Sequence, residues 1–193
     1  MTAAAPLPAS AERLLDVAGP LFFRHGFAAV GVDRIVKESG IAKMTLYRHF
    51  PSKDDLIAAW LTRVDAQFWK TAQGWMGPDT QGPREQLRGF FRGLEKLVGS
   101  PQCLGCPFLL AAAEFPEPGT HAHKVAVANK TALRESFRRL VKGAGVREAA
   151  ALADQLMLLT DGAFGAARMF GPHNPGRRVG AAAEAVIEAA LAA

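Results

Sequence analysis

The sequence contains little cysteine: of 193 residues, only Cys103 and Cys106 are cysteines. Two cysteines are too few for the disulfide framework that stabilises small secreted domains. Long apolar runs are also absent, since no stretch reaches the ~18 uninterrupted apolar residues of a membrane span. The first ten residues have no basic segment followed by an apolar run, so they do not resemble a signal peptide. We therefore expect a cytoplasmic protein with no membrane partner.

Several motifs that carry catalysis are also absent. The chain has no Gly-rich phosphate loop, no Gly-x-Ser-x-Gly elbow and no His-Glu-x-x-His pair. Asp154 and Asp161 are seven residues apart on one expected helix, but solvated or interface carboxylates explain them. We therefore predict a protein that is not an enzyme and that has no catalytic residue, no cofactor and no metal. A helical enzyme is the alternative from another class.

Charge of one sign is not concentrated in either part of the chain. The formal net charge is +5, and residues 1–70 contain nine Lys/Arg against seven Asp/Glu. A basic protein is compatible with a polyanionic partner, but so little asymmetry does not by itself indicate one. Apolar residues make up 49% of the chain, enough for a sizeable core.

What is present is helical periodicity along almost the whole chain, without a convincing strand. Ser10 is a possible N-cap of the first helix, Gly26 a stop, and Pro20 predicts a kink or a local break within it. Ser52 is the expected cap of a long fourth helix. The remaining helices are expected at about 33–39, 43–49, 84–98, 106–115, 121–143, 147–170 and 177–192.

Two short helices joined by a tight turn at Gly40 form the outline of a helix-turn-helix unit over residues 31–50. The apolar residues expected to face inward are Val32, Ile35, Val36, Ile41, Leu46 and Phe50. The remaining surface of the second helix carries Lys43, Met44, Thr45, Tyr47, Arg48 and His49. This mixture suits a recognition helix, because it supplies donors for phosphates, an apolar group for thymine methyls and a forked Arg for guanine edges.

The segments around this unit resemble the TetR family. The matching runs are Gly26-Phe27, Val32-Asp33-Arg34-Ile35, Ser39-Gly40-Ile41 and Thr45-Leu46-Tyr47-Arg48-His49-Phe50-Pro51-Ser52-Lys53-Asp54-Asp55-Leu56. The strong resemblance covers about residues 10–60. The chain departs from the family at Val30 and Gly31, where Thr and Ser are frequent, so a helix-capping hydroxyl is missing.

The resemblance implies a set of DNA contacts. Thr45, Tyr47, His49 and Lys53 would contact phosphates. Base edges or methyl groups would be met by Lys43, Met44, Tyr47 and Arg48. Arg34, on the supporting helix, would add a further phosphate contact.

The resemblance also implies a two-part, all-α protein. The segment 74–83 contains three Gly and two Pro and is the best candidate linker. We therefore predict a three-helix helix-turn-helix DNA-binding domain within residues 8–68. A larger helical domain for effector binding and dimerisation would occupy residues 74–193.

A TetR-like C-terminal domain would enclose a pocket for a small-molecule effector. The residues that we assign to this pocket are Phe68, Phe90, Phe91, Phe108, Met157 and Phe164. The helix at 147–170 is apolar nearly all round and must be buried, for which a partner subunit is the natural cover. We expect a homodimer through the last two helices, a near-palindromic double-stranded operator and a ligand-responsive repressor.

The pair Cys103 and Cys106 leaves one alternative open. A Cys-x-x-Cys occurs in redox dithiols and in zinc sites, and His121 and His123 follow. A redox- or metal-sensing regulator is therefore a second hypothesis. The His-x-His spacing is tighter than in common zinc sites, which favours two reduced thiols instead.

Overall fold

The computed structural model describes residues 7–192, which form nine α-helices, three short 3-10 helices and no strand. The expected all-α fold is therefore confirmed. The α-helices are α1 (Ala9–His25), α2 (Val32–Ser39), α3 (Lys43–His49), α4 (Lys53–Met76), α5 (Pro83–Val98), α6 (Pro107–Glu114), α7 (His121–Gly143), α8 (Ala149–Phe170) and α9 (Val179–Ala192). None of the helices formed by residues 7–192 has both the length and the apolar content needed to span a bilayer.

The contacts of the chain divide it into two compact units. Unit 1 consists of Met1–Val64 and Leu110–Ala126, and unit 2 of Asp65–Leu109 and Val127–Ala193. The division falls inside α4, α6 and α7, so the chain passes between the units within helices. The expected linker is shorter than predicted, because α4 continues through Gly74 to Met76. Trp75 and Met76 pack against the core of unit 2, which keeps the last turn of α4 helical.

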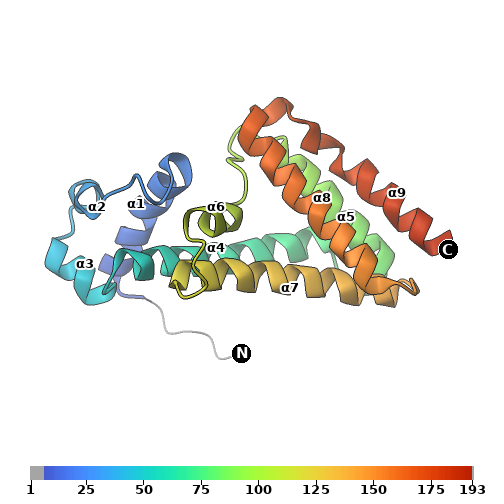
Figure 1. The fold of residues 1–193 in the computed structure, drawn as a ribbon, viewed down its shortest axis with the longest axis horizontal. Helices are drawn as coiled ribbons and strands as arrows, with labels where there is room; N and C mark the ends of the chain where they lie inside the picture. The colour runs from blue at the N-terminus through green and yellow to red at the C-terminus, as the bar shows by residue number, and fades with distance from the viewer. Residues whose placement is uncertain (1–6, 193) are drawn as a thin grey trace. The chain divides into compact units, whose positions relative to one another are not determined.

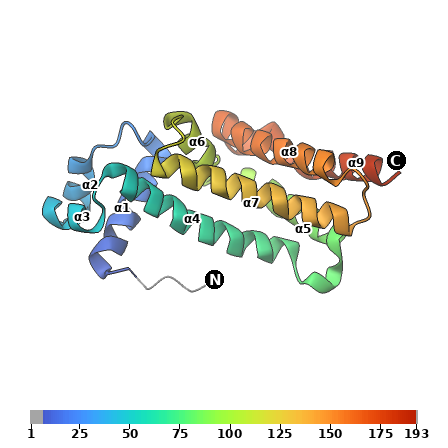
Figure 2. The same cartoon turned by 60° about the horizontal axis from the view of Figure 1, so that its bottom comes forward.

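In unit 1, α1, α2 and α3 gather at the N-terminal end of α4 (Figures 1 and 2). Their apolar faces form a dry core, and the fully buried side chains include Leu14, Leu15, Phe22, Phe27, Ile35, Leu46, Leu56, Ile57 and Leu61. The ring of Trp60 meets the ring of Phe22 at a centroid distance of 6.3 Å and that of Phe27 at 5.9 Å. Such tilted and edge-on aromatic pairs add to the stability that burial provides.

The packing of α1 on α4 depends on a glycine. A Cβ atom at Gly19 would lie 2.0 Å from the indole Nε1 of Trp60. No side chain can occupy that position without displacing the indole, so the glycine permits the close approach of the two helices.

The expected cap of α1 was wrong, and the local break that Pro20 could have caused is not formed. The helix is unbroken through Pro20. Both Pro20 and Asp16, whose carbonyl loses its helical donor, are exposed, so water can satisfy that carbonyl. Ser10 lies within the first turn, after the N-cap residue Pro8, which makes no side-chain cap. The hydroxyl of Ser10 is instead bonded to a side chain of α3.

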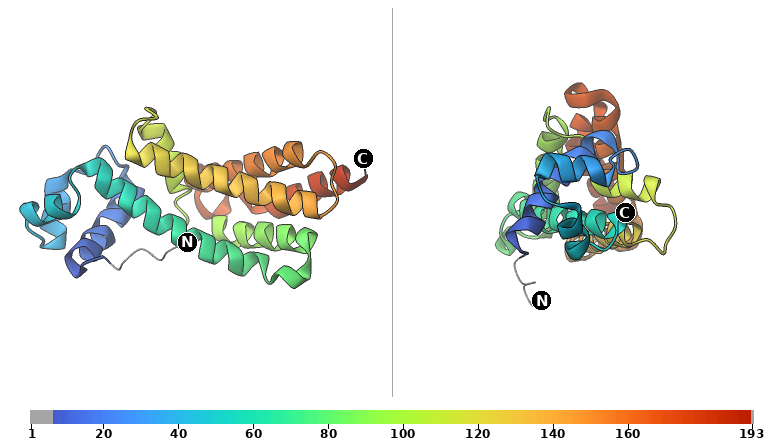
Figure 3. Two further views of the ribbon diagram at one scale, coloured as in Figure 1. Left: turned by 90° about the horizontal axis from the view of Figure 1, so that it is seen from below. Right: turned by 90° about the vertical axis from the view of Figure 1, so that its left-hand side faces the viewer.

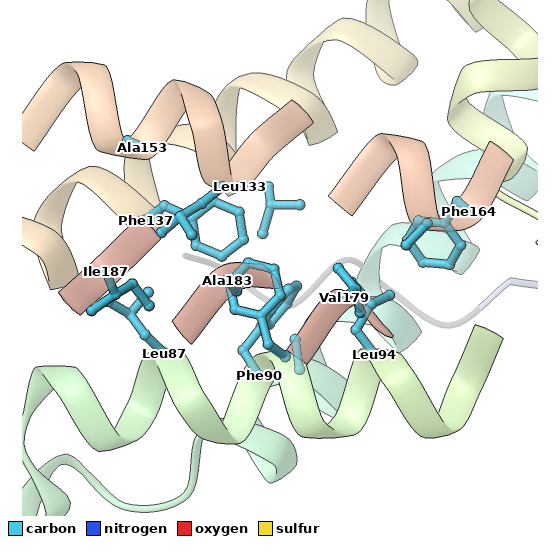
Figure 4. Packing of buried hydrophobic residues seen from close by; sticks show 14 of the residues in the cluster. Leu87, Phe90, Leu94, Leu133, Phe137, Ala153, Phe164, Val179, Ala183 and Ile187 are labelled. Atoms are coloured by element: carbon cyan, nitrogen blue, oxygen red, sulfur yellow. The ribbon is translucent and has the colours of Figure 1, made fainter. Parts of the chain in front are cut away.

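In unit 2, α9 lies beside both α5 and α8 (Figure 3). In the core of unit 2, Phe90 of α5 meets Phe137 of α7 with ring centroids 5.0 Å apart (Figure 4). The ring centroid of Phe91, also of α5, lies 5.7 Å from that of Phe137. Outside this core, an ion pair links α5 to α9. Arg88 of α5 binds Glu184 of α9, and the Arg88 Nε–Glu184 Oε2 distance is 2.8 Å.

Asp154 and Asp161 of α8, which the sequence indicates to be solvated or interface carboxylates, are ion-pair partners of α7. Asp154 pairs with Arg134, and Asp161 pairs with Lys130. These carboxylates therefore join two helices of unit 2.

Candidate nucleic-acid interface

The turn between α2 and α3 is built by Ser39 and Gly40. Gly40 ends α2 in the left-handed conformation, with φ of 71°, as the sequence predicts. The Ser39 hydroxyl donates to the carbonyl of Val36 and accepts the backbone N–H of Ile41. These bonds satisfy backbone groups at the end of α2 and set the direction of α3.

The helix α3 is held by its apolar side and leaves its polar side open. Leu46 is completely buried and Phe50 nearly so. Met44 is 83% exposed, Tyr47 is 41% exposed, and Arg48 also faces solvent. The predicted outward face of α3 is therefore accessible within unit 1, as DNA recognition requires.

Two of the predicted contact residues are engaged in exposed ion pairs. The Lys43 Nζ lies 2.7 Å from Asp33 Oδ1, and this hydrogen-bonded pairing raises the pKa of Lys43. Arg34 Nε lies 2.8 Å from Glu38 Oε1, one turn further along α2. Exposed pairs of this kind are weak, so a phosphate can replace either carboxylate.

His49 and Thr45 lie at the half-buried edge of α3. The His49 Nε2 is hydrogen-bonded to the Ser10 hydroxyl of α1 at 2.7 Å. This hydrogen bond, which joins residues 39 positions apart in the sequence, orients the imidazole of His49. Ser10 is thus a residue of the site that sequence reasoning assigned to a helix cap; no local pattern could have indicated its partner.

Ser52 caps the N-terminus of α4 as the sequence predicts, and the structure shows that the cap is reciprocal. The Ser52 hydroxyl accepts the N–H of Asp55, and the Asp55 carboxylate accepts both the N–H and the hydroxyl of Ser52. Lys53, which follows, does not point freely into solvent: its Nζ donates to the carbonyl of Ala28 at 3.3 Å. Burial of this ammonium group lowers the pKa of Lys53.

Residues 110–126 complete unit 1, which sequence reasoning missed. The Asp54 carboxylate accepts the N–H groups of His121 and Ala122 and so caps the start of α7. The imidazole of His121 is bonded to Asp55 at 2.7 Å. Hydrogen bonds with Ser52 and His121 lower the pKa of Asp55. No local signal indicated this pairing, because Asp54 and Asp55 are the acidic residues expected in the first turn of their own helix α4.

The six residues predicted to line an effector pocket all belong to unit 2. Phe90, Phe91 and Phe164 are buried in its core, and Phe68 and Met157 pack against that core while partly exposed. Phe108, in the first turn of α6, is also buried. Their assignment to a pocket remains a prediction.

The cysteines belong to unit 2, and the histidines that follow them belong to unit 1. Both thiols are free, with Cys103 buried, and burial raises the pKa of its thiol. His121 binds Asp55, and His123 Nδ1 lies 2.7 Å from the carbonyl oxygen of Phe115. Within residues 7–192, no three His, Cys, Asp or Glu side chains converge as metal ligands, so the Cys2His2 arrangement is not formed in this structure.

The outer face of α8 and α9 is apolar and open. Leu158 is 73% exposed, and Met169 and Phe170 at the end of α8 are 76% and 60% exposed. An open groove of about 270 Å³ lies between the two helices, and its lining includes Leu158, Gly162 and Ala182. Side chains of this kind are rarely left in water together.

Comparison with known proteins places these observations in a family. Residues 14–60 match the model of the family described as bacterial regulatory proteins, tetR family. SCO4454, a TetR-family transcriptional regulator from Streptomyces coelicolor, is 32% identical in sequence, with a TM-score of 0.85 over 94% of this chain and 96% of that one.

Two further relatives are transcriptional regulators of the helix-turn-helix type. YjdC from Escherichia coli is 24% identical over 151 residues, which cover 78% of this chain and 79% of the relative. LmrA from Bacillus subtilis is 41% identical over 106 residues, which cover 54% of this chain and 56% of the relative. The chain thus belongs to the TetR family of DNA-binding transcriptional regulators, which are not enzymes.

Proposed function

We propose that the protein is a homodimeric repressor that recognises a near-palindromic operator through α3 and is released from it by a small apolar effector. The observation that carries operator recognition is the orientation of α3. Its one fully buried side chain, Leu46, anchors the helix, while Met44, Tyr47 and Arg48 are exposed on the opposite side. An anchored helix with an open polar face suits insertion into a major groove.

The chemistry of each side chain indicates its proposed role. Arg48 offers a forked donor for a guanine edge, and Met44 an apolar surface for a thymine methyl. Lys43 stands beside them and would exchange Asp33 for a base edge. These three residues would provide the sequence preference.

The proposed phosphate contacts surround that face. Thr45, Tyr47 and His49 lie on α3, Arg34 lies on α2, and Lys53 begins α4. Arg34 would exchange Glu38 for a phosphate, and Lys53 would exchange the carbonyl of Ala28. Because these contacts do not depend on base identity, they would set affinity and register.

The exposed apolar face of α8 and α9 supports a dimer. In the proposed dimer a second copy of the chain covers Leu158 and the neighbouring groove, where Gly162 and Ala166 allow close approach of helices. Two-fold symmetry then presents two recognition helices, so the half-sites would be about one helical turn apart, ~34–36 Å.

The proposed effector site lies in unit 2, among the six aromatic and methionine side chains named above. Bulky apolar side chains such as Phe164 and Met157 can accommodate an apolar molecule but offer few polar groups to orient it. An effector of this chemistry would have to bind the DNA-free form more tightly than the DNA-bound form.

The experiment that tests operator recognition is selection of bound duplexes from a random-sequence pool, followed by titration of the recovered duplex. Arg48→Ala should abolish the sequence preference. Arg139→Ala, which removes the same charge from an exposed position on α7, is the matched control and should bind as the wild type does. Failure of the wild-type protein to enrich any duplex, or full binding by Arg48→Ala, would contradict the proposal.

A further inference from the structure

The turn between α1 and α2 is clamped by a carboxylate from a distant part of the sequence. Glu114, the last residue of α6, belongs to unit 1. Its Oε1 accepts the N–H of Phe27 at 3.2 Å, and its Oε2 accepts the N–H of Ala28 at 2.6 Å. Hydrogen bonds to an ionised acceptor are shorter and stronger than neutral ones. One side chain therefore fixes two consecutive peptides of the turn.

The fit of the carboxylate against the turn is close. Gly26, which precedes these peptides, has φ of 90°, and a Cβ atom there would lie 2.9 Å from Glu114 Oε1. The next residue of the same segment adds an apolar contact, because the rings of Phe115 and Phe27 are 5.8 Å apart. Polar and apolar contacts thus hold the turn together.

The clamped turn also holds a proposed DNA contact. Lys53 donates to the carbonyl of Ala28, whose own N–H is bonded to Glu114. The charge of Glu114 favours the charged form of Lys53 and opposes the effect of burial on its pKa. A continuous series of hydrogen bonds therefore runs from Glu114 at the end of α6 through Ala28 to Lys53 at the start of α4.

The turn matters because α2 has no cap of its own. Gly31 occupies the N-cap position of α2 and provides no side-chain hydrogen bond. A Ser, Thr, Asp or Asn at that position would accept a backbone N–H of the first turn of the helix. The segment that Glu114 fixes leads, three residues later, into the start of α2, the helix that precedes α3.

We propose that Glu114 is a positioning residue for operator binding, which acts through the Phe27–Ala28 turn on α2 and Lys53. This inference rests on the proposed function, because it assigns Lys53 a phosphate contact. Without the carboxylate, the turn must be ordered when DNA binds, and the cost of that ordering is subtracted from the affinity.

The test compares Glu114→Gln with Glu117→Gln in the full-length protein. Both variants remove one negative charge, and Glu117 is exposed in the loop that follows. The glutamine at 114 can accept one of the two N–H groups, but its own NH2 faces the other. The probe is the duplex selected by the wild-type protein, titrated at several salt concentrations and at a temperature where thermal melts show each variant to be folded.

We expect Glu114→Gln to bind the duplex about tenfold more weakly, and Glu117→Gln to stay within about twofold of the wild type. A tenfold change corresponds to about 1.4 kcal/mol. The slope of log K against log salt should fall by about 1.8, because each of the two subunits of the proposed dimer loses one phosphate contact and each contact contributes about 0.9. In a Lys53→Ala background the effect of Glu114→Gln should shrink, since coupled residues are not additive. A purely structural role would lower the melting temperature without moving the slope.

The inference would be overturned if the two Gln variants bound the duplex with equal affinity and equal salt slope. Tighter binding by Glu114→Gln would also overturn it, because the carboxylate would then compete with DNA for Lys53. If Glu114→Gln does not fold, Glu114→Asp is tested in its place. This variant keeps the negative charge but has a shorter side chain, so it should weaken binding of the duplex by a similar factor. Loss of binding by Arg48→Ala combined with wild-type binding by both Glu114 variants would reject this inference alone. Failure of the wild type to select any duplex would reject the proposed function.

Discussion

Replacing Leu46 with Ala tests how the recognition helix is held. Leu46 is the one buried residue of α3 and is completely shielded from water. Truncating a buried Leu to Ala costs about 2–5 kcal/mol, which combines lost transfer free energy with the cavity left behind. We expect a loss near the middle of that range, about 3 kcal/mol, because α3 is short and can partly collapse onto the cavity.

The assays are urea and thermal unfolding at a fixed protomer concentration, together with titration of the selected duplex. A loss of about 3 kcal/mol should lower Tm by roughly 6–12 °C in a chain of this size. Operator affinity should fall as well, because α3 loses its only deeply buried contact. Met44→Ala is the stability control on the same helix: Met44 is 83% exposed, so its replacement should change the free energy of unfolding by less than about 0.5 kcal/mol.

The result that would refute this reasoning is a Leu46→Ala protein that loses less than about 1 kcal/mol and binds the duplex with unchanged affinity. In that case α3 would be fixed by its polar edge rather than by its apolar side.

Other outcomes follow from the packing and the charges. Gly19→Ala should lower the free energy of unfolding by about 1–3 kcal/mol, because the new methyl group overlaps the indole of Trp60; thermal melts at constant concentration would measure it. The pKa of Asp55 is lowered by hydrogen bonds with Ser52 and an imidazole, so its contribution to stability is present above about pH 4 and is lost as the pH falls through the lowered pKa. The stability difference between the wild type and Asp55→Asn should therefore shrink between pH 6 and pH 3, and a constant difference would contradict this origin. Burial raises the pKa of Cys103, so its thiol should react with iodoacetamide at pH 7 far more slowly than in urea-unfolded protein.

The parts of the fold that local sequence determines were predictable. Gly40 marks the end of α2 because only a residue without a side chain adopts the left-handed conformation readily. Ile35 and Leu46 recur with the apolar period of their helices, and both are fully buried. The cap at the start of α4 was predictable from Ser52, whose hydroxyl accepts the N–H of Asp55.

The parts that depend on distant pairings were not predictable. Ser10 has the composition of a cap, yet its hydroxyl is bonded to His49. Glu114 lies 86 residues from Ala28, and a helical period indicates only that a polar residue avoids the core, not which backbone group it meets. The unit boundary was missed for the same reason, since glycine and proline mark turns but do not show where a later segment packs.

The return of residues 110–126 to unit 1 has a consequence for protein engineering. A fusion that carries only the first four helices would transplant Phe27 without Phe115 against it, and Asp54 without the helix start that it caps. Swapping the specificity of this regulator into another scaffold therefore calls for a graft of two sequence segments, joined or co-expressed, rather than a single cut after the recognition helix.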